Sequence, residues 1–349
     1  VKEVSVIPVD ESASEWQVVF GNGYNSNSGK AALFALNLED GTLAGGGPVI
    51  VGTSTDNGMA GVTAINSGDD YYANVIYGGD LQGNMWKFVP SNSGWKTAFG
   101  STKNPEPLFV ATDGSNRQPI TSRPEVTVTD SGKNVVVFGT GKYLENGDVL
   151  DHSVQSIYGI FDSDVKGTVD RNDLLEQTIN SEGEVTVSGE SRPYRIFSDT
   201  DVADSHDGWL IDLISPDEGE QGERIVVRPT IRGEAVVFVS LIPSASPCDG
   251  GGSSWLIAIS KNNGGAIDGG VIDVNDDGEI DEKDYVNDGG VKVPVSSIGF
   301  DSILSRVNFV SGKGDVDQGY GSTSKGDIAR VGLKGLGGLL GRQSWRQVR

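Results

Sequence analysis

The feature that most constrains the fold of this chain is a short apolar run that recurs along the sequence and ends at a glycine. The clearest copies end at Gly21, Gly78 and Gly139, which lie 57 and 61 residues apart. The copies are Trp16–Gly21, Ala73–Gly78 and Asn134–Gly139, with a weaker fourth copy at Ala235–Ser240. Self-similarity at such a period is typical of repeat architectures, in which one supersecondary unit is built several times.

Each run is followed by a second apolar run, so the repeating unit contains at least two adjacent strands. The second runs are Ala31–Leu38, Gly83–Phe88, Gln155–Phe161 and Ser254–Ile259. In the first of them, alternate residues from Ala32 to Leu38 are all apolar, as a strand packed on another sheet requires. The 50 glycines of the chain suit the turns between such strands. We therefore predict an all-β fold, a β-propeller with long loops, with a β-sandwich carrying long insertions as the alternative.

Two stretches depart from the strand pattern. Residues Arg171–Gln177 predict a short helix capped by Asn172 or Asp173. Ser311–Asp327 is polar and rich in glycine, which predicts a loop, and residues 328–349 contain basic side chains and no acid. We expect the blades within residues 1–310. Residues 311–349 would then be a loop and a basic segment that closes or packs on the propeller, a frayed end being the alternative.

The charge, the apolar runs and the cysteine and histidine content of the chain exclude several classes of partner and site. It carries 49 acidic and 27 basic residues, a formal net charge of −22, which argues against binding to nucleic acid. No apolar run approaches 18 residues, so we expect no membrane-spanning helix. A single cysteine, Cys248, and two histidines, His152 and His206, exclude a disulfide framework and a histidine-rich metal centre. The chain begins with Val and shows no signal peptide, so we expect it to be a segment of a longer protein.

One acidic segment, residues 273–284, has the spacing of a calcium-binding loop. Counted from Asp273 as position 1, oxygen ligands fall at positions 3, 5, 7, 9 and 12. They are the side chains of Asn275, Asp277, Asp281 and Asp284 and, at position 7, the carbonyl of Glu279. Gly278 occupies position 6, where the sharp turn needs a permissive backbone. Position 12 is an aspartate, whose reach is shorter than that of glutamate. No long flanking helices are evident, so we predict a Ca²⁺ clip between strands; the alternative is an Asx-rich turn without a metal.

A second segment matches the same template less well. Asp162, Asp164, Gly167, Asp170 and Asp173 fall at positions 1, 3, 6, 9 and 12. Position 5, however, is Lys166, which places an ammonium where a carboxylate should bind the ion. We do not predict a metal site there.

Several motifs resemble signatures of the PilY1/PilC family of type IV pilus biogenesis and tip-associated proteins. They are Phe20–Asn25, Gly79–Phe88, Ile120–Pro124, Phe138–Leu144, Gln155–Asp162 and Gly341–Gln347. Together they run from near the start of the chain to its last residues, in an order and spacing that make the resemblance specific. The family's Asp-alternating loop corresponds to Asp273, Asn275, Asp277 and Asp281, with Asn275 standing where an aspartate would add charge.

The resemblance implies a β-propeller with quinoprotein-like blades, of which this chain holds the whole ring or a part. It also implies an exported protein at the bacterial cell surface, associated with the outer membrane or the pilus tip. Expected partners are other type IV pilus components such as minor pilins, and host or abiotic surfaces. By analogy with the family, Ca²⁺ occupancy of the Asp-rich loop would regulate pilus extension and retraction or surface attachment.

Two other classes of function remain open. One is a propeller enzyme, either a quinoprotein dehydrogenase or a glycosidase. The dehydrogenase would need two adjacent cysteines, whereas Cys248 stands alone, and the glycosidase would need paired carboxylates in one cleft. The other is a carbohydrate- or host-binding adhesin without a regulatory metal, in which exposed aromatic residues such as Trp95 or Tyr320 would stack on sugars. We expect no enzyme activity.

Overall fold

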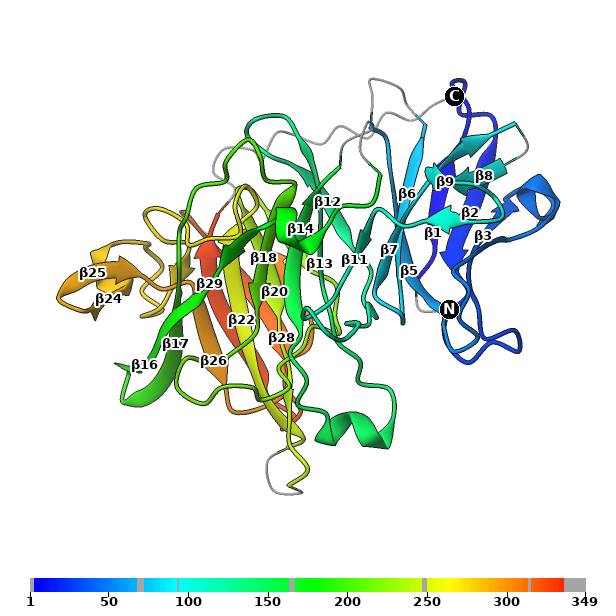
Figure 1. Cartoon of the computed structure of the whole chain (residues 1–349). Coiled ribbons are helices and arrows are strands. Elements are labelled where there is room, and N and C mark those ends of the chain that lie inside the picture. Colours follow the sequence, from blue (N-terminus) through cyan, green and yellow to red (C-terminus); the bar gives the residue numbers. More distant parts are fainter. Residues whose placement is uncertain are drawn as a thin grey trace.

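The computed structural model describes residues 3–67, 72–92, 94–162, 167–246, 250–312 and 315–335. Within these ranges the chain folds into β-strands connected by loops and four short 3-10 helices. It forms five sheets of four or more strands, each called a blade below and numbered by the position of its central strands in the chain. Figure 1 shows the blades side by side, from the blue N-terminal strands to the orange and red C-terminal strands. No helix in the described residues is long and apolar enough to cross a membrane.

Blade 1 pairs its strands in sequence order, whereas blades 2 and 3 each also pair strands that are not consecutive. Blade 1 contains β1 (Ser5–Pro8), β2 (Trp16–Gly21), β3 (Ala31–Asn37) and β4 (Val49–Val51). Blade 2 contains β5 (Met59–Ile65), β6 (Val75–Asp80), β7 (Asn84–Ser91) and β11 (Phe109–Val110), with β8 (Gly94–Thr97) also on β7. Blade 3 contains β12 (Glu125–Val128), β13 (Asn134–Gly139), β14 (Ser156–Phe161), β18 (Gly208–Asp212) and, parallel to β18, β15 (Leu175–Gln177).

Blade 4 is interleaved in sequence with blade 3, through β16 and β17, and with blade 5, through β23. Blade 4 contains β19 (Thr230–Arg232), β20 (Ala235–Val239), β22 (Gly252–Ser260), β26 (Ser297–Phe300), β17 (Glu190–Phe197) and β16 (Ile179–Val187), with β21 (Ile242–Pro243) on β22. Blade 5 contains β27 (Asn308–Val310), β28 (Val316–Ser322), β29 (Ile328–Lys334) and β23 (Ile272–Asp273). Two small hairpins are β9 (Phe99–Gly100) with β10 (Pro105–Glu106), and β24 (Tyr285–Asp288) with β25 (Val291–Pro294). The 3-10 turns are η1 (Ala44–Gly46), η2 (Asn146–Leu150), η3 (Arg171–Asp173) and η4 (Glu282–Asp284).

The hydrophobic core is divided into four clusters, each between two successive blades. The side chains of Val19 and Trp86 belong to the cluster between blades 1 and 2, and Phe109 and Tyr158 to the next one. Trp209 lies between blades 3 and 4, and the last cluster joins blades 4 and 5. This radial division of the core is what a propeller predicts, because each blade packs only on its neighbours. The prediction of an all-β propeller is confirmed.

The predicted strands agree closely with the observed ones. The runs beginning at Trp16 and Asn134 coincide with β2 and β13, and the run at Ala235 with β20. The second runs correspond to β3, β7, β14 and β22. The register within blades pairs the two kinds of run directly, as in Val136 opposite Ile160. The recurring apolar runs were therefore sufficient to place these strands.

Two predictions about local structure were wrong. The expected helix is only the single turn η3, whose N-cap is Asp170, and residues 175–177 instead extend beside β18 as β15. Pairing with β18 gives these backbone groups hydrogen bonds that a two-turn helix would have made internally. The glycine-rich stretch expected as a loop contains β28, because Gly319 and Gly321 leave room for side chains such as Phe309 packed against that strand.

The Gly79–Phe88 motif forms a network of buried hydrogen bonds at the turn between β6 and β7. Asp80 is fully buried, and its carboxylate accepts hydrogen bonds from the backbone N–H groups of Gln82 and Asn84. It also accepts from the side chains of Asn57 and Trp86, at 3.0 and 2.8 Å. A buried carboxylate is tolerated where several donors satisfy it. The residues of this motif thus serve to stabilise blade 2.

Candidate cation-binding loop

The Asp-rich loop lies between blade 5 and the β24–β25 hairpin. It begins in β23, where Asp273 pairs with Gly332 of β29, and it ends at η4. A Cβ atom on Gly332 would lie 2.7 Å from the Cβ of Asp273, so only glycine allows this approach of the two strands. Gly278 has a φ of +85°, which confirms the permissive backbone expected at position 6. The sheet therefore fixes the first ligand position.

Asp273 and Asp284, the first and last predicted ligands, are buried together. Their residues are 1 % and 3 % exposed, and their carboxylates accept only backbone N–H groups among their hydrogen bonds. Asp273 accepts from Asp277 and Gly278, while Asp284 accepts from Val274 at 2.7 Å. Burial raises the pKa of Asp273, and the nearby charge of Asp284 raises it further. No described cation pairs with either carboxylate.

The carboxylates of Asp277 and Asp281, at positions 5 and 9, form ion pairs with Lys283. The Nζ atom of Lys283 lies 3.0 Å from Asp277 Oδ2 and 3.1 Å from Asp281 Oδ2. The Glu279 carboxylate is 3.9 Å from the same atom. Hydrogen bonding to Lys283 lowers the pKa of Asp277, and the Lys283 backbone N–H does so for Asp281. The ammonium group of Lys283 thus lies near three carboxylates of the loop, those of Asp277, Glu279 and Asp281.

Asn275 and an arginine from blade 4 shape the rest of the loop. The side-chain oxygen of Asn275 accepts from the Asp277 backbone N–H at 2.8 Å. Arg192 of β17 donates to the carbonyl of Val274 at 2.5 Å and to the carboxylate of Asp276 at 2.7 Å. Sequence reasoning did not find this contact, because Arg192 lies 84 residues from Asp276. The loop is therefore attached to both of the last two blades.

The donor set suits a hard divalent cation, although the ligands are not gathered around one point. Every proposed ligand is an oxygen, as Ca²⁺ prefers, and two of the carboxylates are buried without a countercharge. In the described part of the chain, no three acidic, histidine or cysteine side chains converge closely enough to enclose an ion. Asp273 and Asp284 are two of the expected ligands and lie together. Asp277 and Asp281, two others, are instead paired with Lys283.

The segment that begins at Asp162 serves a structural purpose at its first position. The Asp162 carboxylate lies 2.7 Å from Lys87 Nζ, and the two side chains are 4 % and 2 % exposed. It also accepts a hydrogen bond from the Tyr77 hydroxyl. Residues 163–166, which include Asp164 and Lys166, lie outside the described residues. The buried ion pair already supplies Asp162 with a cation.

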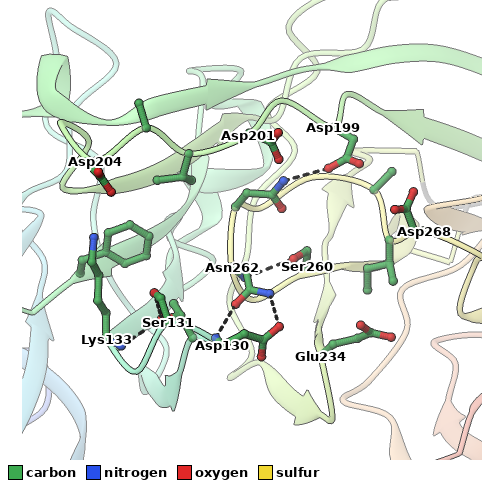
Figure 2. Close-up of a pocket in the computed structure, with 17 residues that line it drawn as sticks. Asp130, Ser131, Lys133, Asp199, Asp201, Asp204, Glu234, Ser260, Asn262 and Asp268 are labelled. Carbon is green, nitrogen blue, oxygen red and sulfur yellow. Dashed lines mark hydrogen bonds between the residues drawn. The ribbon is translucent and has the colours of Figure 1, made fainter.

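An acidic cavity, separate from the Asp-rich loop, lies at one end of blades 3 and 4. It has a volume of about 620 Å³ and is lined by the turn at Asp130, by residues 199–204 and by residues 260–268. Figure 2 shows Asp199 and Asp201 on one side of the cavity, with Asp130 and Glu234 on the other. Hydrogen bonds from Lys261 and Asn262 lower the pKa of Asp130, which is the opposite of what a general acid needs. Asp130 therefore does not suit the role of a glycosidase general acid.

The residues considered for other chemistry have ordinary surroundings. The Nδ1 atom of His206 accepts from the backbone N–H of Ala203 in the turn before β18, and His152 is exposed. Trp95 is half-buried against the core cluster between blades 1 and 2 and donates to the side chain of Gln17, whereas Tyr320 is 43 % exposed. Cys248 and the Gly341–Gln347 motif lie outside the described residues, as does the end of the basic segment.

Comparison with known proteins finds relatives that are named as PilY1 proteins. The sequence profile of the PilY1 beta-propeller domain matches residues 9–191. A Type IV pilus biogenesis factor PilY1 homolog of Xylella fastidiosa is 32% identical over 343 residues, covering 97% of this chain and 26% of the relative. The Type IV pilus biogenesis factor PilY1 of Pseudomonas aeruginosa strain PAO1 is 30% identical over 309 residues, covering 78% of this chain and 26% of the relative. This chain therefore spans about a quarter of the length of these curated relatives.

A solved structure supports the same relationship. The crystal structure of the Pseudomonas aeruginosa PilY1 C-terminal domain superimposes with a TM-score of 0.80 at 25% sequence identity. The match covers 95% of this chain and 72% of that chain. The order of the blades is therefore shared along nearly the whole of the present sequence.

Proposed function

This chain belongs to the family of PilY1 beta-propeller domains, and from that premise we propose that it acts in type IV pilus biogenesis as a calcium-responsive propeller. Its relatives are named as pilus biogenesis factors. The proposed partners are other pilus components, such as minor pilins, and surfaces to which pili attach. The proposed location is outside the cell, at the bacterial surface or the pilus tip. Nothing in this role requires catalysis.

The observation that supports the calcium response is the pair of buried carboxylates without a described countercharge, Asp273 and Asp284. Two like charges held together away from water repel each other, and this opposes the ordered loop. Bound Ca²⁺ would supply the missing positive charge and would be coordinated by the carboxylate oxygens. The ligands proposed are the side chains of Asp273, Asn275, Asp277, Asp281 and Asp284 and the carbonyl of Glu279.

The residues of the chain itself would transmit the response. For Asp277 and Asp281 to turn inward, Lys283 must release both carboxylates. Arg192 and the β23–β29 pairing would keep the loop attached to blades 4 and 5 during this change. A partner that contacts the loop or the adjoining β24–β25 hairpin would then meet a surface of different charge and order in the two states.

Calorimetric titration of the purified chain with CaCl₂ tests the proposal, together with melting curves in calcium and in chelator. One-site binding is expected, and a calcium concentration 100-fold above Kd should stabilise the fold by about 2.7 kcal/mol. Asp277→Ala should abolish both the heat and the melting shift. Glu282→Gln removes one charge from the same loop at a non-ligand position and should retain both.

The biological part of the proposal needs a separate readout. Surface pili would be counted in a strain carrying Asp277→Ala in the full-length protein, beside a strain carrying Glu282→Gln. A changed pilus number only in the Asp277 strain is expected. Identical melting of the parent protein with and without calcium would refute the calcium response. Unchanged piliation after deletion of the whole propeller would refute the role in biogenesis.

A further inference from the structure

A small arginine-lined cavity lies where the first strands of successive blades come together. Strands β1, β5, β12 and β19 contact one another in succession along this inner side of the array. The cavity has a volume of about 200 Å³. It is lined by Glu3, Gly61, Thr121, Ser122, Arg123, Val226, Val227, Arg228 and Arg306. Residues from all five blades or their leading segments therefore meet at this point.

The sequence places two of the arginines at equivalent positions of the repeat. Ile120–Pro124 and Ile225–Pro229 share the pattern Ile-x-x-Arg-Pro, directly before β12 and β19. The two isoleucines also occupy matching places, since Ile120 packs over Gly79 of blade 2 and Ile225 over Gly139 of blade 3. The first of these segments is one of the family-like motifs, and the stability of its own blade does not explain its arginine.

The charges at the cavity do not balance. Arg228 Nε pairs with Glu125 Oε1 at 2.7 Å, whereas Glu3 Oε2 lies 3.5 Å from Arg123 and 3.6 Å from Arg228. Arg306 has no ion pair with a described carboxylate, and its Nε donates to Thr230 Oγ1 at 3.3 Å. Burial lowers the pKa of the Arg306 guanidinium, and the charge of Arg228 lowers it further. Three guanidinium groups thus face two carboxylates, in a chain that is strongly acidic elsewhere.

A buried hydroxyl at the same cavity has no partner. Ser122 is 4 % exposed, and its Oγ atom makes no hydrogen bond with any described residue. A buried polar atom of this kind is uncommon in native structures and points to a missing partner. An anionic oxygen would accept from this hydroxyl and from the neighbouring guanidinium groups, which suit carboxylate and phosphate geometry. The Glu3 carboxylate lies near Arg123 and Arg228, but its Oε2 atom accepts no hydrogen bond from a described residue.

We propose that this cavity binds a small oxygen-bearing anion, a tetrahedral oxyanion or a single carboxylate group, through Arg123, Arg228, Arg306 and the hydroxyl of Ser122. The volume is sufficient for one such group. Binding here would link the inner strands of the five blades by a shared counterion. The site is separate from the Asp-rich loop, so this proposal stands or falls independently of the calcium response.

Calorimetric titration of the whole chain with inorganic phosphate, and separately with acetate, tests the proposal at constant ionic strength in chloride. Saturable binding of either anion is expected, with a concentration-dependent rise in melting temperature. A tighter fit for phosphate would identify a tetrahedral ligand, and a tighter fit for acetate a carboxylate. Ser122→Ala should weaken binding several-fold. Arg306→Gln should weaken it about ten-fold or more, since it removes a charge-assisted hydrogen bond.

Two further measurements distinguish a site from general attraction to arginine. Arg330 is exposed on β29, so Arg330→Gln removes the same charge elsewhere and should leave the affinity unchanged. In the absence of phosphate and acetate, Arg306→Gln should melt at the same or a higher temperature than the parent, because it relieves repulsion from Arg228. No saturable binding of either anion, or equal loss of affinity in the Arg306 and Arg330 variants, would overturn the proposal.

Discussion

Residues 162–173 and 273–284 place aspartates at nearly the same spacing, but their first members have opposite surroundings. Asp162 is buried against Lys87, a cation supplied by β7 from 75 residues earlier. Asp273 is also buried, yet it faces another buried acid, Asp284, and no described cation. The difference teaches that burial of a carboxylate does not by itself indicate a metal site. What matters is whether the fold already provides the countercharge.

Removing the first aspartate of each segment should give the strongest contrast. Asp162→Asn leaves the buried Lys87 ammonium without its partner, and we expect a loss of about 3–5 kcal/mol in the free energy of unfolding. Asp273→Asn in calcium-free buffer removes a charge that burial disfavours, and we expect a loss of only about 1 kcal/mol. Denaturant unfolding of both variants would measure the difference. Equal losses would mean that the two environments are not distinct.

The close approach of Gly332 to Asp273 gives the next largest effect. Gly332→Ala adds a Cβ atom 2.7 Å from the Cβ of Asp273 and should destabilise the fold by about 1–3 kcal/mol. It should also weaken calcium binding by displacing the first ligand. Gly326→Ala on the neighbouring turn is the comparison, because no atom lies within 4 Å of its added Cβ and it tests the strain of a positive φ alone. Normal calcium affinity in the Gly332 variant would show that the position of Asp273 is not limiting.

A smaller effect is expected from the lysine within the loop. Lys283→Met removes the ammonium that holds Asp277 and Asp281, so calcium would no longer compete with it. We expect the calcium affinity to rise about three-fold, in keeping with the modest strength of exposed ion pairs. Lys292→Met, in the β25 strand, is a matched control with a more distant acidic neighbour. A lower affinity in the Lys283 variant would mean that this lysine supports the bound loop.

The smallest predicted effect concerns pH. In calcium-free protein, Lys283 lowers the pKa of Asp277 and of Asp281 below their ordinary value. The resulting stabilisation is present above the ordinary pKa and is lost as the pH falls through the lowered values. The melting temperatures of the parent and of Lys283→Met should therefore differ at pH 6 and converge toward pH 2. A constant difference across this range would contradict the assigned ion pairs.

The sequence predicted local features of the fold well and long-range ones poorly. Recurring apolar runs that end at glycine placed β2 and β13, because a strand of this kind can be recognised from residues adjacent in sequence. The same reasoning failed for β28, whose glycines become strand residues only beside Phe309, and for β15, which depends on pairing with β18. Sequence spacing also located the Asp-rich loop. It did not predict the hydrogen bonds from Arg192 to the loop or the ion pairs of Lys283 with Asp277 and Asp281.

By itself, the sequence determined that this chain is a repeated array of strands with an oxygen-rich loop of defined spacing. Both properties are local, since they depend on residues a few positions apart. Only the tertiary structure decided which acid receives a cation and where Arg123, Arg228 and Arg306 meet. Those arrangements join residues far apart in the chain, and the packing of the blades alone brings their charges within a few ångströms of one another.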